Sequence, residues 1–135
     1  MSQTDKFNRI TIGEDATNRL KMLKAITGMT PNYLGRIGFC YSLNEPRPPN
    51  PEEYDKEGQT FNRYTLLGRH DALYMALLKE RMIQEGKDPE DDLYKEFLAH
   101  LNRGVIRVHG NVRDLTNLQD LVPGEIKGLE TQGEE

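Results

Sequence analysis

A helix stop and a helix start lie within four residues near the N-terminus, and this places tight limits on the fold. Gly28 follows an apolar helical stripe and suits the position after a helix, where the left-handed conformation favours glycine. Thr30 and Pro31 then suit the N-cap and the first position of a new helix. The sequence therefore predicts two helices joined by a tight turn within residues 14–43.

A short strand is predicted ahead of these helices. Residues 6–12 are rich in aromatic and β-branched side chains, and Ile10 and Ile12 alternate onto one face. The outward positions are then Phe7, Arg9 and Thr11. A strand of this length needs a partner strand.

The order of strand, helix, turn and helix over residues 6–43 resembles the ribbon-helix-helix fold. In that fold two chains pair their strands into a ribbon, and the ribbon enters the major groove of DNA. Arg9 and Thr11 would then meet base edges. The alternative is an ordinary antiparallel strand beside a helical hairpin in a monomeric domain.

Two glycines in the second predicted helix, Gly35 and Gly38, call for a packing explanation. Each costs about 1 kcal/mol relative to alanine in a helix interior. Close approach of another helix would compensate for this cost. We therefore predict that Gly35 and Gly38 pack in the core of an oligomer.

The rest of the chain predicts a mainly α fold with a few short strands, in which additional helices follow the ribbon-helix-helix-like N-terminal half. We expect one domain over residues 1–110: strand-helix-turn-helix at 6–43, a proline-rich loop at 44–60 and a helical part at 61–110. Within the helical part we expect a strand over Phe61–Leu67 and a helix from Asp71 through Gln84, whose apolar positions include Leu73, Ala76, Leu77 and Met82 or Ile83. A helix from Asp88 to Gly104 and a strand over Val105–Val108 should follow. Residues 111–135 predict a short helix and an acidic flexible tail.

The charge distribution favours a nucleic-acid partner more than the net charge of −4 does. Residues 1–43 carry a formal charge of +3, while residues 86–135 carry −5. Such asymmetry is typical of a basic binding face beside an acidic remainder, although surface charge also varies along any chain. The candidate DNA-binding residues are Lys6, Arg9, Arg19, Lys21, Lys24 and Arg36.

The residues expected of an enzyme or a metal site do not form a recognisable pattern. The three histidines are scattered, and the single cysteine, Cys40, lies among apolar residues and is expected in the core rather than as a nucleophile. Phosphate-binding and dinucleotide-binding motifs are missing. We predict no catalytic residue, cofactor or metal. With no apolar run long enough to span a membrane, we expect a cytoplasmic protein.

Three segments resemble the DndE family of bacterial DNA sulfur modification proteins. They are the run from Phe7 to Gly13, the segment from Leu23 to Leu43, which contains Gly-Met-Thr-Pro-Asn-Tyr-Leu-Gly-Arg-Ile-Gly, and the run from Phe61 to Gly68 together with Asp71 to Leu78. The resemblance covers the chain from about Phe7 to about Gly110.

The resemblance implies a role in DNA phosphorothioation, in which sulfur replaces a non-bridging phosphate oxygen. It implies a non-enzymatic subunit that binds double-stranded DNA, with a preference for nicked duplex, and assembles as a homotetramer. Its implied partners are a cysteine desulfurase, an ATP-using sulfur-transfer subunit and an ATPase subunit. The family carries no established chemical residues onto this chain, so the candidate DNA-binding residues come from the charge distribution alone.

Two alternatives to this DNA-binding subunit stay open. A ribbon-helix-helix transcriptional repressor would read one operator sequence through Arg9 and Thr11. A protein-only assembly adaptor would never touch DNA and would present its acidic C-terminal half and proline-rich loop to partners.

Overall fold

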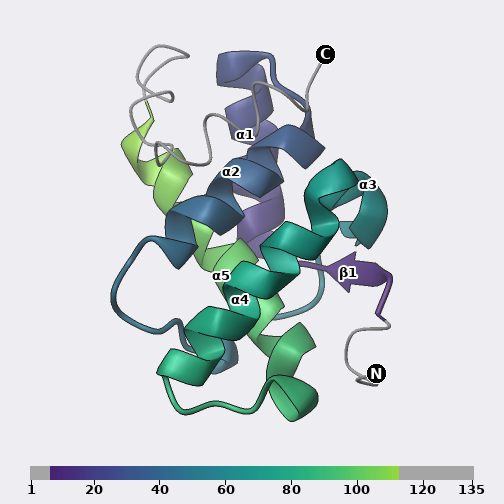
Figure 1. Cartoon of the computed structure of the whole chain (residues 1–135). Coiled ribbons are helices and arrows are strands. Elements are labelled where there is room, and N and C mark those ends of the chain that lie inside the picture. Colours follow the sequence, from purple (N-terminus) through teal and green to yellow (C-terminus); the bar gives the residue numbers. More distant parts are fainter. Residues whose placement is uncertain (1–6, 113–135) are drawn as a thin grey trace.

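The structure, a computed structural model, describes residues 7–112 and is mainly α-helical (Figure 1). Along the chain it contains β1 (Arg9–Thr11), α1 (Glu14–Thr27), α2 (Pro31–Leu43), the 3-10 turn η2 (Pro51–Glu53), β2 (Thr60–Asn62), α3 (Arg63–Leu67), the 3-10 turn η3 (Gly68–His70), α4 (Asp71–Gln84) and α5 (Pro89–Asn111). The predicted short helix and tail beyond Val112 lie outside the described residues.

The predicted helix boundaries at Gly28, Thr30 and Asp88 are confirmed. Gly28 ends α1 with a φ of 76°, which is the left-handed region that favours glycine. The side chain of Thr30 accepts a hydrogen bond from the Tyr33 amide at 3.3 Å, which caps α2. The side chain of Asp88 accepts one from the Glu90 amide at 2.9 Å, which caps α5. Proline follows both caps at the first helical position.

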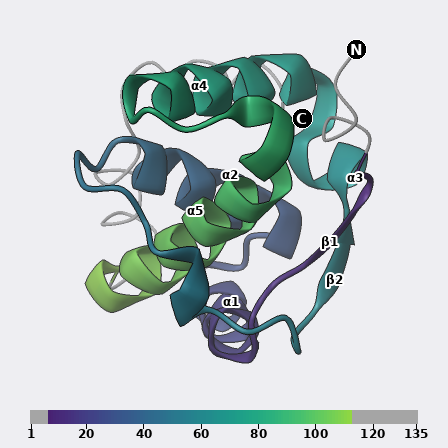
Figure 2. The ribbon, with the colours of Figure 1, turned by 90° about the horizontal axis from the view of Figure 1, so that it is seen from below.

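Helix α5 is the central element of the fold. Every residue from Phe97 to Val105 is buried, so the middle of this helix is covered on all sides. Figure 2 shows α2 and α5 lying between α4 on one side and α1 on the other. The core is therefore built around one helix rather than around the sheet.

A close contact between Gly38 and Gly104 brings α2 and α5 together. A Cβ atom at Gly104 would lie 1.7 Å from the carbonyl oxygen of Gly38, which leaves no room for a side chain. The prediction that Gly104 ends the helix, with a strand over Val105–Val108, is wrong, because α5 continues to Asn111. Here glycine lets two backbones touch inside a helix, and that contact outweighs its low helix propensity.

The sheet is formed within one chain. Strand β1 pairs antiparallel with β2, and Ile10 lies opposite Phe61. The described residues therefore fit the alternative interpretation, a local antiparallel pair beside a helical hairpin, and the likeness to a two-chain ribbon is not shown. The predicted strand over Phe61–Leu67 is shorter than expected, because the Asn62 side chain accepts from the amides of Tyr64 and Thr65 and starts α3.

Phe7 points inward, and the prediction that it faces outward is wrong. Its ring packs against Tyr94, with the two ring centroids 4.9 Å apart, and against Phe97 at 5.7 Å. The guanidinium carbon of Arg63 lies 4.6 Å from the Phe7 ring centroid. Ile10 and Ile12 are fully buried, as the alternation predicts.

Helix α4 carries apolar side chains on two faces, and of its predicted apolar positions only Met82 lies in the core. The face that packs into the core is formed by Tyr74, Met75, Leu78 and Met82. Leu73, Ala76, Leu77 and Ile83 are exposed instead. The described part of the chain thus leaves an apolar helix face uncovered, which we call the outer face of α4.

Candidate nucleic-acid interface

Lys21 and Lys24 form a basic pair on the surface of α1. Both side chains are exposed near the C-terminal end of α1. Residues three apart in a helix lie on the same side, so the two ammonium groups can face one ligand together. Within residues 7–112 neither lysine side chain forms an ion pair or a hydrogen bond, so both charges are available.

Arg19 belongs to a different side of the same helix. At about 100° per residue, Arg19 and Lys21 point about 200° apart around the axis. The Arg19 Nε donates to Asp15 at 3.0 Å, and its Nη1 lies 3.3 Å from His109 Nδ1. Part of the Arg19 charge is therefore neutralised, and the three candidates on α1 do not form one continuous face.

Arg9 lies exposed on strand β1, on the outer side of the sheet. On the same side of the sheet, Thr11 of β1 and Thr60 of β2 share a hydrogen bond, with their hydroxyl oxygens 2.9 Å apart. The outer side of the sheet is therefore polar, while Ile10 and Phe61 occupy the core side. Lys6 lies outside the described residues.

Arg36 is a core residue and does not share a surface with the lysines of α1. Only 8% of it is exposed, and its Nε donates to the Leu66 carbonyl at 2.6 Å. Gly68, whose φ is +67°, lies over the guanidinium group, since a Cβ there would be 3.6 Å from the Arg36 Cζ. The role that the structure gives Arg36 is to join α2 to α3.

Gly35 and Gly38 have close contacts within a single chain. A Cβ at Gly35 would lie 2.8 Å from Leu66 Cδ1, and one at Gly38 would lie 2.8 Å from the Val105 amide nitrogen. Both positions are buried between helices of the same chain. The structure thus gives an intramolecular reason for these glycines, and packing between subunits stays a prediction.

A buried polar cluster, missed by the sequence analysis, joins α2 to α5. Arg103 Nε donates to Ser42 Oγ at 2.8 Å, which leaves the Ser42 hydroxyl hydrogen free to donate to His100 Nδ1, also at 2.8 Å. Burial, and then the charges of Arg103, Arg81 and Lys87, lower the pKa of His100 to about 3. His100 is therefore neutral and structural. Since Ser42 is fully buried, the pair has no access to a substrate.

The proline-rich loop is held by two arginines that the sequence analysis also missed. Arg103 Nη1 donates to the Arg47 carbonyl at 2.7 Å, and Arg81 donates to the carbonyls of Leu43, Pro46 and Arg47. Arginine can reach several carbonyls because its guanidinium presents five donors. The sequence places Arg81 and Arg103 in two predicted helices, but it does not reveal that both contact this loop.

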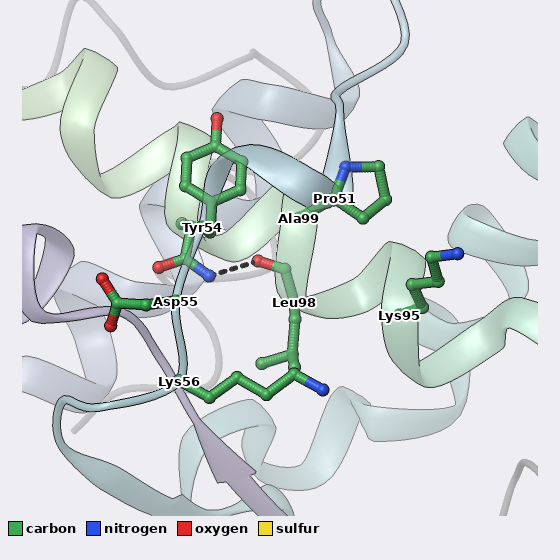
Figure 3. A pocket seen from close by; sticks show the side chains of 8 residues that line it. Pro51, Tyr54, Asp55, Lys56, Lys95, Leu98 and Ala99 are labelled. Atoms are coloured by element: carbon green, nitrogen blue, oxygen red, sulfur yellow. Dashed lines mark hydrogen bonds between the residues drawn. The ribbon is translucent and has the colours of Figure 1, made fainter.

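Two hollows formed by residues between 7 and 112 are each too small for a nucleotide or a typical cofactor. The hollow in Figure 3 has a volume of about 40 Å³ and is lined by Tyr54, Asp55, Lys56 and Lys95, among others. A neighbouring hollow beside Gly13 has about 130 Å³. Pockets that bind small molecules usually have volumes of roughly 300 Å³ or more. Asp55 serves the fold here: it accepts the amides of Glu57 and Glu14, and these hydrogen bonds lower its pKa.

Other kinds of site find no support in the described residues. Between residues 7 and 112, histidine, cysteine and acidic side chains form no group that could hold a metal ion. Cys40 is buried, as expected. Among the helices that the structure describes, none is long and apolar enough to cross a membrane.

Comparisons with known proteins identify the relatives of the chain. The family model for "DNA sulphur modification protein DndE" matches residues 9–114. The crystal structure of DndE from Escherichia coli B7A, "involved in DNA phosphorothioation modification", has a TM-score of 0.63 and 27% identity, over 73% of this chain and 95% of that one. A DndE variant with two glycine-to-lysine substitutions has a TM-score of 0.61 and 25% identity, over 75% and 96%. The search of curated proteins gives no match.

Proposed function

Because the chain belongs to the DndE family of the DNA phosphorothioation machinery, we propose that it serves that machinery as a non-catalytic, DNA-binding subunit. The observation that carries the proposal is the exposed pair Lys21 and Lys24 at the end of α1, which has no ion-pair partner within residues 7–112. Basic side chains that contact phosphates supply most of the affinity for DNA that does not depend on sequence. A non-catalytic subunit that holds DNA through its backbone would use this kind of contact.

Of the six candidate residues, we retain Arg9, Lys21 and Lys24 as DNA contacts, with Arg19 in a weaker role beside Asp15. Arg36 is left out because it is buried against α3. Lys6 stays a candidate from the sequence. The ligand that we propose is double-stranded DNA, with nicked duplex preferred, because a nick removes the stiffness that opposes bending around a protein.

The test is a gel-shift titration of intact and nicked duplexes of the same sequence, each at several salt concentrations. We expect tighter binding to the nicked duplex and affinity that falls steeply with salt. Duplexes of unrelated sequence should bind equally well. A preference for one palindromic sequence would select the repressor alternative instead, and no binding at low salt would reject the DNA-binding function.

The outer face of α4 favours a second role, assembly with other proteins. Its side chains Leu73, Leu77 and Ile83 are 37%, 38% and 60% exposed, and exposed apolar patches mark protein contacts. We propose that this face binds either further copies of the chain, in a homotetramer, or another subunit: the cysteine desulfurase, the sulfur-transfer subunit or the ATPase.

The variant Leu77→Gln/Ile83→Gln tests this second role. We expect its unfolding midpoint to stay within a few degrees of the parent value, because neither side chain is buried. Light scattering should then show a smaller assembly, or co-purification should show the loss of one partner subunit. An unchanged assembly with all partners retained would reject the α4 contact.

A further inference from the structure

Helix α1 extends beyond the end of α5. The two helices run in the same direction, since the Gly13 amide donates to Asn102 Oδ1 at 2.9 Å and Arg19 Nη1 lies 3.3 Å from His109 Nδ1. Helix α5 ends two residues after His109, at Asn111. Eight residues of α1 follow Arg19, whereas only two residues of α5 follow His109, so the last turns of α1 reach beyond this end of α5 (Figure 1).

The projecting turns expose an apolar pair between charged neighbours. Met22 is 50% exposed and Ile26 is 45% exposed, and they lie four residues apart on one side of the helix. Lys21 and Lys24 are exposed beside them. A ligand for this surface would combine apolar side chains with negative charge.

The segment that follows α5 in the sequence has this composition. Residues 113–135 contain six acidic and two basic residues, so the whole formal net charge of −4 lies in that segment. Three of its leucines recur at a spacing of three: Leu115, Leu118 and Leu121. The segment starts directly after Val112, where α5 ends beside α1, and 23 residues can span up to about 75 Å when extended. The end of α1 is well within its reach.

We propose that residues 113–135 return onto the last two turns of α1 and compete there with DNA. The leucines cover Met22 and Ile26, while the carboxylates lie near Lys21 and Lys24. DNA must displace the segment before it reaches the two lysines, so the chain limits its own affinity. The competition rests on the proposed DNA-binding function, whereas the docking of the segment does not.

Hydrogen exchange of the full chain tests the docking without DNA. The variant Leu115→Ser/Leu118→Ser/Leu121→Ser should raise the exchange rate of the amides in residues 22–27 by about threefold or more, because the cover of Met22 and Ile26 is lost. The amides of α4 serve as the internal control and should not change. Equal exchange in parent and variant would overturn the docking. Protection that depends on protein concentration would assign this surface to a second copy and would overturn it too.

Duplex binding tests the competition in the full chain. The tail variant Asp114→Asn/Asp120→Asn/Glu125→Gln/Glu130→Gln should bind duplex DNA about tenfold more tightly than the parent at low salt, with a smaller gain at high salt. The control variant Glu52→Gln/Glu53→Gln/Glu57→Gln/Glu80→Gln removes the same charge from exposed sites elsewhere and should gain only about twofold.

The outcomes separate the two proposals. An equal gain in both variants would overturn the competition, since total charge alone would then explain it. If no form binds DNA, the proposed DNA-binding function fails and the competition fails with it, while the exchange experiment still decides whether the segment docks on α1.

Discussion

At the scale of single residues, Gly104 sets the distance between α2 and α5. We expect Gly104→Ala to destabilise the protein by more than about 3 kcal/mol, because its methyl group would overlap the Gly38 carbonyl oxygen and force two central helices apart. Gly110→Ala is the matched control, since a Cβ there meets nothing within 4 Å and alanine favours the helix. Urea unfolding checks both. A Gly104→Ala protein as stable as the control would contradict the close contact.

His100 makes stability depend on pH in a defined direction. The folded protein keeps this imidazole neutral down to about pH 3, whereas the unfolded chain protonates it near its ordinary pKa of 6.5. Between these values the unfolded state binds more protons, so stability falls as the pH falls below 6.5, by about 1.4 kcal/mol per pH unit from this group.

Urea midpoints at pH 7, 6 and 5 measure this slope. His100→Gln should flatten the slope between pH 6.5 and 5, while His109→Gln, at a half-buried position, should leave it in place. A His100→Gln protein with the same pH slope as the parent would contradict this role of His100.

Single residues also show which features of the fold could be predicted from the sequence and which could not. The caps at Thr30 and Asp88 and the stop at Gly28 were predictable because each depends on neighbours within a few positions. The inward positions of Arg36 and Phe7 were not, because both depend on segments more than twenty residues away: Leu66 for Arg36, and α5 for Phe7. A charge count treats a buried arginine and an exposed one alike.

At the scale of elements, two arginines fix the proline-rich loop to the helices. Arg103 donates to Ser42 Oγ, to the Ser42 carbonyl and to the Arg47 carbonyl. We expect Arg103→Lys to cost about 1.5–3 kcal/mol and to speed amide exchange in residues 44–50, because an ammonium group cannot reach all three acceptors.

Arg107→Lys is the control for this substitution. Arg107 is exposed, and its guanidinium donates to Glu45 at 2.7 Å, so the change should cost less than about 0.5 kcal/mol. Similar losses in the two variants would show that Arg103 has no special role in holding the loop.

The elements differ in how well they could be predicted from the sequence. Helices α1 and α2 follow from periodicity and from the signals at Gly28, Thr30 and Pro31. Helix α5 was divided wrongly at Gly104 because its β-branched residues favour a strand. The face of α4 could not be chosen because apolar residues occur all round it. Which face packs inward depends on α5, and therefore on contacts that a local pattern does not contain.

At the scale of the whole molecule, the residues that the structure describes bring one polar pair of a catalytic type together. The Ser42 and His100 side chains meet, but they are buried in a structural cluster. Charge is distributed unevenly along the sequence: the formal charges of residues 1–112 sum to zero, and the net charge of −4 comes from residues 113–135. The sequence shows a formal charge of +3 over residues 1–43, but only the fold separates Lys21 and Lys24 from the paired Arg19 and the buried Arg36.

The most direct test of the DNA-binding claim compares two double variants of equal charge. Lys21→Gln/Lys24→Gln removes the proposed contacts, and Lys56→Gln/Lys95→Gln removes two exposed lysines near the hollow of Figure 3. Affinity for nicked duplex should fall about tenfold in the first variant, with a salt dependence shallower by about two phosphate contacts, and should stay near the parent value in the second. Equal affinity in the two variants would contradict the account.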